Sequence, residues 1–200
     1  MGVAFTLWGS DVTWLELVAF ALSLWMVACN MRVKVLGWPL AMSSSALYAL
    51  LFVNSKLYGE AGLQLLFVVV AAWGWRQWLR GQGEAGQGPG VQRMPPRELA
   101  HALALTLAAW PLLGWSLARL TDSDVPYLDA LATVGSVTGQ VLLGRKRLEN
   151  WAVWLAVNLF SVGLFASKGL WLTVLLYALF AALSVAGWRA WRALMPAGQR

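Results

Sequence analysis

The sequence predicts an all-α integral membrane protein in which seven transmembrane helices form a parallel 3+1+3 repeat. Three observations lead to this fold class. Of the 200 residues, 60% are hydrophobic and 12% are charged, whereas a soluble domain is about half apolar and a quarter charged. Seven segments are apolar and long enough to cross a hydrocarbon core of ~30 Å as helices. Finally, two parts of the chain resemble each other.

The seven apolar segments are expected to be helical because lipid cannot satisfy the hydrogen bonds of an open backbone. We expect a first three-helix repeat within residues 1–80, a linker helix at 98–118 and a second three-helix repeat at 126–192. The segment 81–97 is rich in Gly, Pro and Gln and predicts a flexible cytoplasmic linker. The predicted spans are 12–30, 37–54, 59–79, 98–118, 126–144, 150–167 and 169–188.

The basic residues support this count and predict an orientation. With seven spans, only three of the fifteen Lys and Arg residues, Lys56, Arg119 and Lys168, fall on the side of the N-terminus. Basic loops mark the cytoplasmic side, so the N-terminus is expected in the periplasm and the C-terminus in the cytoplasm of a bacterial inner membrane. The net charge of +6 is then explained by topology, and no nucleic-acid partner is expected.

The internal repeat aligns Gly74 with Gly187. Residues 74–78 read GWRQW and residues 187–191 read GWRAW, and at the same offset Trp38 corresponds to Trp151. After three helices the chain emerges on the opposite side of the membrane, and one linker helix brings it back to the first side. The two triplets should therefore run in the same direction, with a site near the bilayer midplane between them, as in some transporters.

No predicted span has an Asp, Glu, Lys, Arg or His at its centre. Proton relays and many ion-coupled pumps need such groups, so we expect passive, uncoupled movement of a solute. Coupling to sodium bound by backbone and hydroxyl oxygens is the alternative. The chain has one Cys and one His. An enzyme would need a nucleophile, an acid–base pair or metal ligands facing one another, so we expect no enzymatic activity, no metal and no cofactor.

The sixth span places Trp151, Trp154 and Asn158 on one helix face, at spacings of three and four residues. At the repeat offset, Ser45 corresponds to Asn158, with Tyr48 one turn further. These residues are candidates for substrate binding. Structural alternatives remain. The tryptophans near the cytoplasmic side could form an aromatic belt, Asn158 could bridge helices, and Ser45 could only pack. The tryptophans concerned are Trp38, Trp75, Trp78, Trp151, Trp188 and Trp191.

Gln64 and Tyr177 are a second pair of candidates. Gln64 precedes Trp75 by the same number of positions as Tyr177 precedes Trp188, so the two correspond in the repeat; bridging between helices is again the alternative. Aromatic side chains bind flat rings and favour cationic ones, and an amide can pair with a substrate amide through one donor and one acceptor. This set therefore suits a planar and positively charged heterocycle.

The chain resembles the PnuC family of vitamin transporters over residues 12–192. The resemblance depends on order and spacing: Gln64 and GWRQW in the first half, then ENWAVW at 149–154, Asn158, KGL at 168–170, Tyr177, GW at 187–188 and Trp191. It implies a SWEET-like 3+1+3 fold, facilitated diffusion of nicotinamide riboside, trapping of the riboside by a cytoplasmic kinase, and a homotrimer. It also implies that Trp151, Trp154 and Asn158 contact the ring and its amide.

The sequence therefore favours a uniporter for nicotinamide riboside in the bacterial inner membrane. Family members are thought to carry thiamine or riboflavin instead, so the same fold with another vitamin is the main alternative. A membrane scaffold or sensor that transports nothing is a further alternative.

Overall fold

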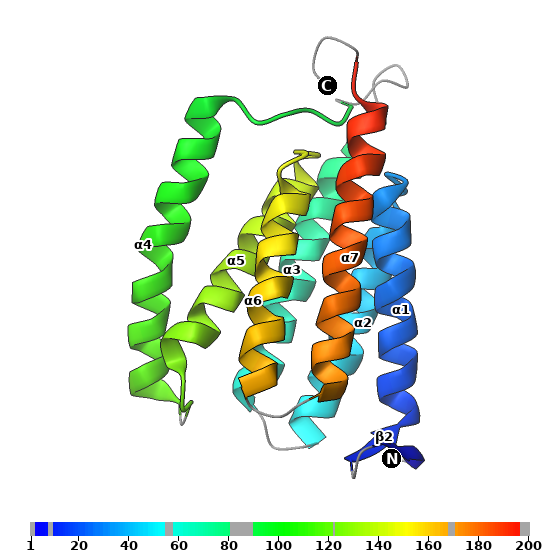
Figure 1. Cartoon of the computed structure of the whole chain (residues 1–200), viewed down its shortest axis with the longest axis vertical. Helices are drawn as coiled ribbons and strands as arrows, with labels where there is room; N and C mark the ends of the chain where they lie inside the picture. The colour runs from blue at the N-terminus through cyan, green and yellow to red at the C-terminus, as the bar shows by residue number, and fades with distance from the viewer. Residues whose placement is uncertain are drawn as a thin grey trace. The chain divides into compact units, whose positions relative to one another are not determined.

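The computed structural model describes residues 3–7, 10–54, 58–80, 90–121, 123–167 and 171–196 (Figure 1). In this part of the chain there are seven α-helices, one for each predicted span, so the helical fold is confirmed. The last helix continues beyond the predicted end at residue 188, and its final turns carry exposed Arg189 and Arg192. The helices are α1 (Trp14–Met31), α2 (Gly37–Asn54), α3 (Tyr58–Arg80), α4 (Pro96–Leu120), α5 (Pro126–Gly144), α6 (Asn150–Ser167) and α7 (Trp171–Leu194).

A short β-hairpin precedes α1 and was not predicted. Strand β1 (Val3–Leu7) pairs antiparallel with β2 (Ser10–Thr13), with Thr6 opposite Asp11 and an irregularity between Val3 and Phe5. Val, Phe and Thr suit a strand, but the hairpin is too short to produce a clear pattern beside the long apolar helices.

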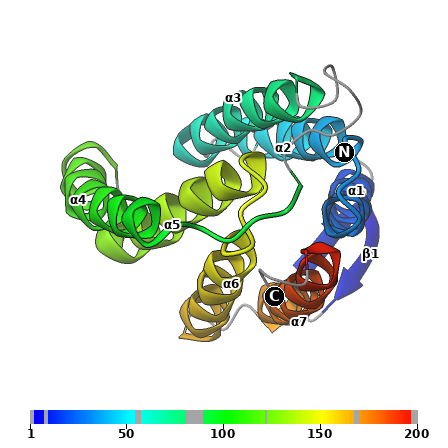
Figure 2. The ribbon, with the colours of Figure 1, turned by 90° about the horizontal axis from the view of Figure 1, so that it is seen from above.

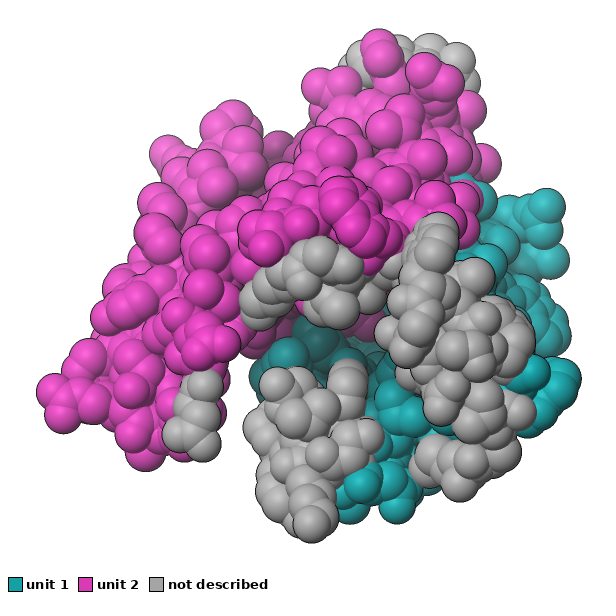
Figure 3. Space-filling view, turned by 60° about the horizontal axis from the view of Figure 1, so that its bottom comes forward, with its two compact units in different colours: residues 1–83 teal, residues 84–200 magenta. Residues whose placement is uncertain are grey.

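The chain forms two compact units, Met1–Gly83 (unit 1) and Glu84–Arg200 (unit 2), coloured separately in Figure 3. In unit 1, α2 packs against both α1 and α3. In unit 2, α4 packs against α5, α5 against α6, and α6 against α7, as the view in Figure 2 shows for these neighbours. Each unit thus contains a row of three consecutive helices, and unit 2 has α4 in addition.

The helices expose apolar side chains, as expected in lipid. Among the described residues, three helices are long and apolar enough to cross a membrane: Pro96–Leu120, Asn150–Ser167 and Val174–Leu194. Many large apolar side chains are exposed along these helices, and together with the composition this indicates a multi-pass membrane protein. The exposed large side chains of α4 are Leu99, Leu103, Leu105, Leu107, Leu112, Trp115 and Leu120.

The turns that follow α1 and α5 are built in the same way. Val33 and Lys146, which correspond at the repeat offset, have left-handed φ angles of 53° and 52°. The amide of the next residue bonds back across five residues, from Lys34 to Cys29 O and from Arg147 to Leu142 O, both at 2.9 Å. This is the Schellman closure of a helix end, in which glycine is usual. Partial burial of the Lys146 side chain in this turn lowers its pKa.

The repeated GWRxW motif packs a tryptophan of the preceding helix in each unit. In unit 1, the Trp38 ring lies on Gly74 and meets Trp78 edge-on, with centroids 5.4 Å apart and planes at 84°. In unit 2, the Trp151 ring lies on Gly187 and meets Trp191 at 5.6 Å and 89°. A Cβ at either glycine would overlap the ring, so the motif requires glycine there.

These four tryptophans are all buried inside their units. The aromatic-belt interpretation of Trp38, Trp78, Trp151 and Trp191 was therefore wrong, because their rings fill contacts between helices instead of facing the lipid headgroups.

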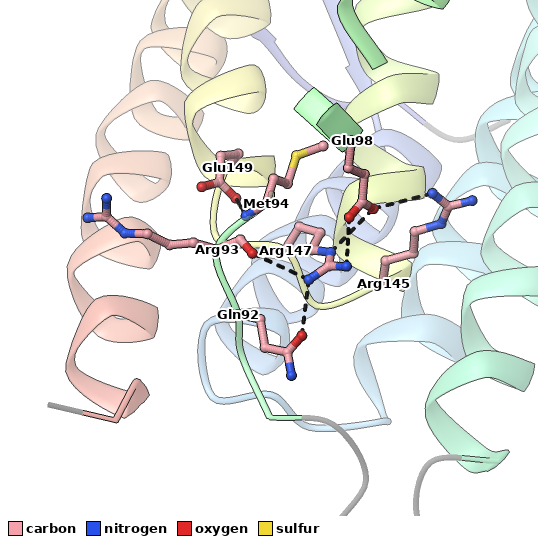
Figure 4. A network of polar contacts seen from close by, with 7 residues as sticks. All are labelled: Gln92, Arg93, Met94, Glu98, Arg145, Arg147 and Glu149. Atoms are coloured by element: carbon pink, nitrogen blue, oxygen red, sulfur yellow. Dashed lines mark hydrogen bonds and ion pairs between the residues drawn. The ribbon is translucent and has the colours of Figure 1, made fainter. Parts of the chain in front are cut away.

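Part of the predicted flexible linker is bound to unit 2 (Figure 4). The backbone of Gln92 pairs with the turn between α5 and α6. Its backbone N–H donates to Lys146 O at 3.1 Å, and its backbone carbonyl accepts from the Leu148 N–H at 2.9 Å. The Arg147 guanidinium bonds to Gln92 Oε1 at 3.0 Å and forms an ion pair with Glu98 at 2.7 Å. Residues 90–95 are thus attached, while residues 81–89 lie outside the described residues.

We predict that Gly74→Ala and Gly187→Ala each lower stability by about 1–3 kcal/mol, because the added methyl group overpacks the tryptophan contact. Thermal unfolding of the purified protein in detergent measures the change. Gly62→Ala and Gly163→Ala are the matched controls, since nothing lies within 4 Å of a Cβ at either position. Equal melting temperatures for all four variants would contradict the packing role of the motif.

We also predict that Glu98→Gln lowers stability by about 1–2 kcal/mol, because it removes the carboxylate from the partly buried Arg147. The exposed Arg97 is one residue away, and Arg97→Gln serves as the control. Thermal unfolding at low and high salt should show a smaller deficit at high salt. A melting temperature of Glu98→Gln equal to that of the control variant would refute the contribution of this ion pair.

Candidate functional site

Asn158 lies in the middle of α6 and is buried against α7. It is 5% exposed, and its Nδ2 donates a hydrogen bond of 3.3 Å to Ser184 Oγ on α7. Ser184, which is 3% exposed, donates in turn to Phe180 O at 2.8 Å. The predicted bridge between helices is therefore present. One bond occupies only part of an amide that can make up to four, so the bridge does not exclude substrate binding.

Ser184 is a buried polar residue of this region that no sequence pattern indicates. Its repeat equivalent is Ala71, and a single serine in an apolar helix has no periodic signal. Its proximity to Asn158 becomes apparent only from the packing of α7 against α6.

Two aromatic groups flank the polar pair along α6 and α7. Seven residues before Asn158 is Trp151, with its contacts to Gly187 and Trp191, and seven residues after it is Phe165. Phe165 stacks on Tyr177 at 5.2 Å and 19°. At 1.5 Å per residue, each group is roughly 10 Å from Asn158 along the helix. The interface between α6 and α7 is thus aromatic at both ends and polar in the middle.

Trp151 and Trp154 contact different neighbours of α6. Trp154 is half-buried against α5, where a Cβ at Gly139 would lie 3.0 Å from Trp154 Cε2. Trp151 is buried against α7, and its indole N–H has no hydrogen-bond partner among the described residues. Contact of either ring with a substrate stays a prediction.

Ser45, Tyr48 and Gln64 belong to unit 1, where each is half-buried: the first two lie on α2 and Gln64 on α3. The buried hydroxyl of α2 is that of Ser44, which hydrogen-bonds to Ser23 Oγ at 2.7 Å. Unit 1 therefore connects its first two helices through serines. The repeat equivalent of Phe165 is Phe52, whose side chain lies outside the described residues.

Comparison with known proteins gives the family. A profile of the nicotinamide mononucleotide transporter family matches residues 13–193. The chain belongs to this family, which includes the PnuC transporters. The PnuC resemblance inferred from the motifs is thereby confirmed.

Individual relatives of the chain transport different vitamins. It is 28% identical to the riboflavin/roseoflavin transporter RibM of Streptomyces davaonensis, over 94% of this chain and 89% of the relative. It is 23% identical to the nicotinamide riboside transporter PnuC of Escherichia coli, over 92% and 87%. It is 28% identical to PnuC of Neisseria mucosa, over 92% and 73%.

The fold also matches a solved structure of the family. A crystal structure of the vitamin B3 transporter PnuC superposes with a TM-score of 0.74 and 27% sequence identity, covering 90% of this chain and 81% of that one. The chain is therefore a multi-pass membrane protein of a vitamin transporter family.

Proposed function

We propose that this protein carries nicotinamide riboside across the bacterial inner membrane by facilitated diffusion, with Asn158 as the central substrate-binding residue. The observation that supports this most is an amide, buried in the middle of an apolar helix, with hydrogen-bonding groups to spare. The PnuC relatives, which transport nicotinamide riboside, add to it.

The chemistry of the riboside fits the residues of α6 and α7. Its carboxamide offers a donor and an acceptor to the Asn158 amide, and its pyridinium ring is a flat cation that aromatic faces attract. We propose Trp151 and Trp154 as ring contacts, with Gln64, Tyr177, Ser45 and Tyr48 as further predicted contacts. Neither α6 nor the part of α7 before Arg189 contains an Asp, Glu, Lys, Arg or His, which favours uniport without a proton relay.

Net uptake then needs a step that removes the free riboside. We propose that a cytoplasmic kinase phosphorylates it, because the added charge prevents its return. The family resemblance supports this trapping step and, as a further part of the proposal, assembly into a homotrimer.

We further infer that the two helix triplets form a parallel 3+1+3 repeat with α4 as the linker helix. At the offset that aligns Gly74 with Gly187, the starts of α1 to α3 coincide with those of α5 to α7 to within a single position. The matching turns at Val33 and Lys146 and the matching tryptophan contacts support the same arrangement. The unequal distribution of basic residues supports a periplasmic N-terminus and a cytoplasmic C-terminus.

Riboflavin is the second candidate substrate, because the RibM likeness covers nearly the whole chain. The pyrimidine edge of its ring system presents carbonyl and N–H groups side by side, so it could also pair with the Asn158 amide. It is uncharged, however, and would gain less from aromatic faces.

Uptake into proteoliposomes separates these possibilities. We predict saturable uptake of radiolabelled nicotinamide riboside that is independent of a sodium or proton gradient, and weak uptake of riboflavin and thiamine. Preference for riboflavin or thiamine would overturn the substrate assignment in favour of that vitamin. Absence of saturable flux for all three would indicate a scaffold or sensor.

We predict that Asn158→Ala weakens riboside binding at least tenfold, because loss of hydrogen bonds in a desolvated site costs on the order of 1–3 kcal/mol. Isothermal titration calorimetry on the purified variant measures the affinity. Asn54→Ala is the control, since Asn54 is exposed at the end of α2. Near-normal affinity of a folded Asn158→Ala protein would remove Asn158 from the site.

A further inference from the structure

We propose that Ser184 is a positioning residue that fixes the direction of the Asn158 amide and so makes the site selective for a carboxamide over a carboxylate. This inference rests on the proposed role of Asn158 in substrate binding.

The Ser184 hydroxyl has a limited set of hydrogen bonds that it can make. A serine hydroxyl has one hydrogen to donate and two lone pairs that accept. Ser184 donates its hydrogen to Phe180 O at 2.8 Å. It can then only accept from Asn158, so the amide must turn its Nδ2 towards Ser184, at 3.3 Å. The reversed amide would place Oδ1 against the lone pairs of Ser184, unless the serine gave up its bond to Phe180.

The fixed amide leaves a defined set of groups for a ligand. Among the described residues, Ser184 is the only hydrogen-bond partner of the Asn158 side chain. One N–H and the carbonyl oxygen of Asn158 therefore remain. A ligand that satisfies both must offer an acceptor and a donor together, as a carboxamide does. A carboxylate has no hydrogen to donate, and its negative charge would face Oδ1.

The first repeat lacks this arrangement. The equivalents of Asn158 and Ser184 are Ser45 and Ala71, and Ala71 is buried without a polar side chain. The oriented amide therefore occurs in the second repeat and not at the equivalent positions of the first. A contact needed only for packing would be expected in both repeats, so this difference favours a role in substrate specificity.

The test compares two ligands that differ only in this group, nicotinamide riboside and nicotinic acid riboside. Calorimetry on the purified full-length protein gives both affinities and their ratio. We expect Ser184→Ala to weaken binding of the amide three- to tenfold, to leave the acid unchanged or stronger, and so to reduce the selectivity ratio at least threefold. We expect Ser184→Thr to retain the ratio, because threonine keeps the hydroxyl.

Ser116→Ala is the matched control. Ser116 lies on α4 and makes the same bond to the carbonyl four residues back, Leu112 O, at 2.9 Å. Its replacement should leave both affinities unchanged. If Ser184→Ala does not fold, Ser184→Cys keeps the size of the side chain with a poor acceptor and should reduce the ratio in the same way.

An unchanged selectivity ratio in folded Ser184→Ala or Ser184→Cys would overturn the inference while leaving the transport of the riboside intact. Failure of the wild-type protein to bind either riboside would instead refute the proposed substrate. If riboflavin is the ligand that binds, riboflavin and its N3-methyl derivative replace the two ribosides. The methyl group removes the same donor, and the same change of ratio is expected.

Discussion

A polar side chain inside an apolar helix must find its hydrogen bonds within the protein, because lipid offers none. This constraint governs the pair formed by Asn158 and Ser184. Ser184 satisfies one donor of the amide, and the proposed substrate would satisfy the rest. The absence of charged side chains from α6 and from α7 before Arg189 follows the same rule: a neutral site carries a small desolvation cost and needs no ion to balance it.

The tryptophan–glycine contacts serve a different purpose. They bring two helices of each unit together at the end where the GWRxW motif lies, and the rings of Trp38 and Trp151 fill the space that Gly74 and Gly187 leave. In unit 2, α6 and α7 are held together at two levels, by this contact before Asn158 and by the stack of Phe165 on Tyr177 after it. Rigid packing at both ends allows a single polar pair between them to be held in one orientation.

Much of the helical fold could be predicted from the sequence, because apolar segments of membrane-spanning length have few alternatives. The GWRxW motif gives the offset of the repeat, but it does not show why the motif occurs twice. A pattern of tryptophans alone does not distinguish a lipid-facing belt from rings that are buried on glycines. Residues 90–95 look like a linker by composition. They are nevertheless attached by Arg147, which is distant in the sequence and is itself held by Glu98.

The candidate site was predictable only in part. Asn158 is conspicuous as the polar residue of an aromatic face, whereas Ser184 becomes visible only when α7 is packed against α6. Repeat symmetry points to Ser45, but the buried hydroxyl of α2 is that of its neighbour Ser44. The two units connect neighbouring helices through different polar residues: Ser44 bonds to Ser23 in unit 1, and Asn158 bonds to Ser184 in unit 2.

The most direct test of the central claim is a structure of the protein in lipid nanodiscs with nicotinamide riboside bound. We predict the carboxamide within hydrogen-bonding distance, about 3 Å, of the Asn158 amide, with the bond to Ser184 retained. A riboside bound away from α6, with no contact to Asn158, would contradict the account.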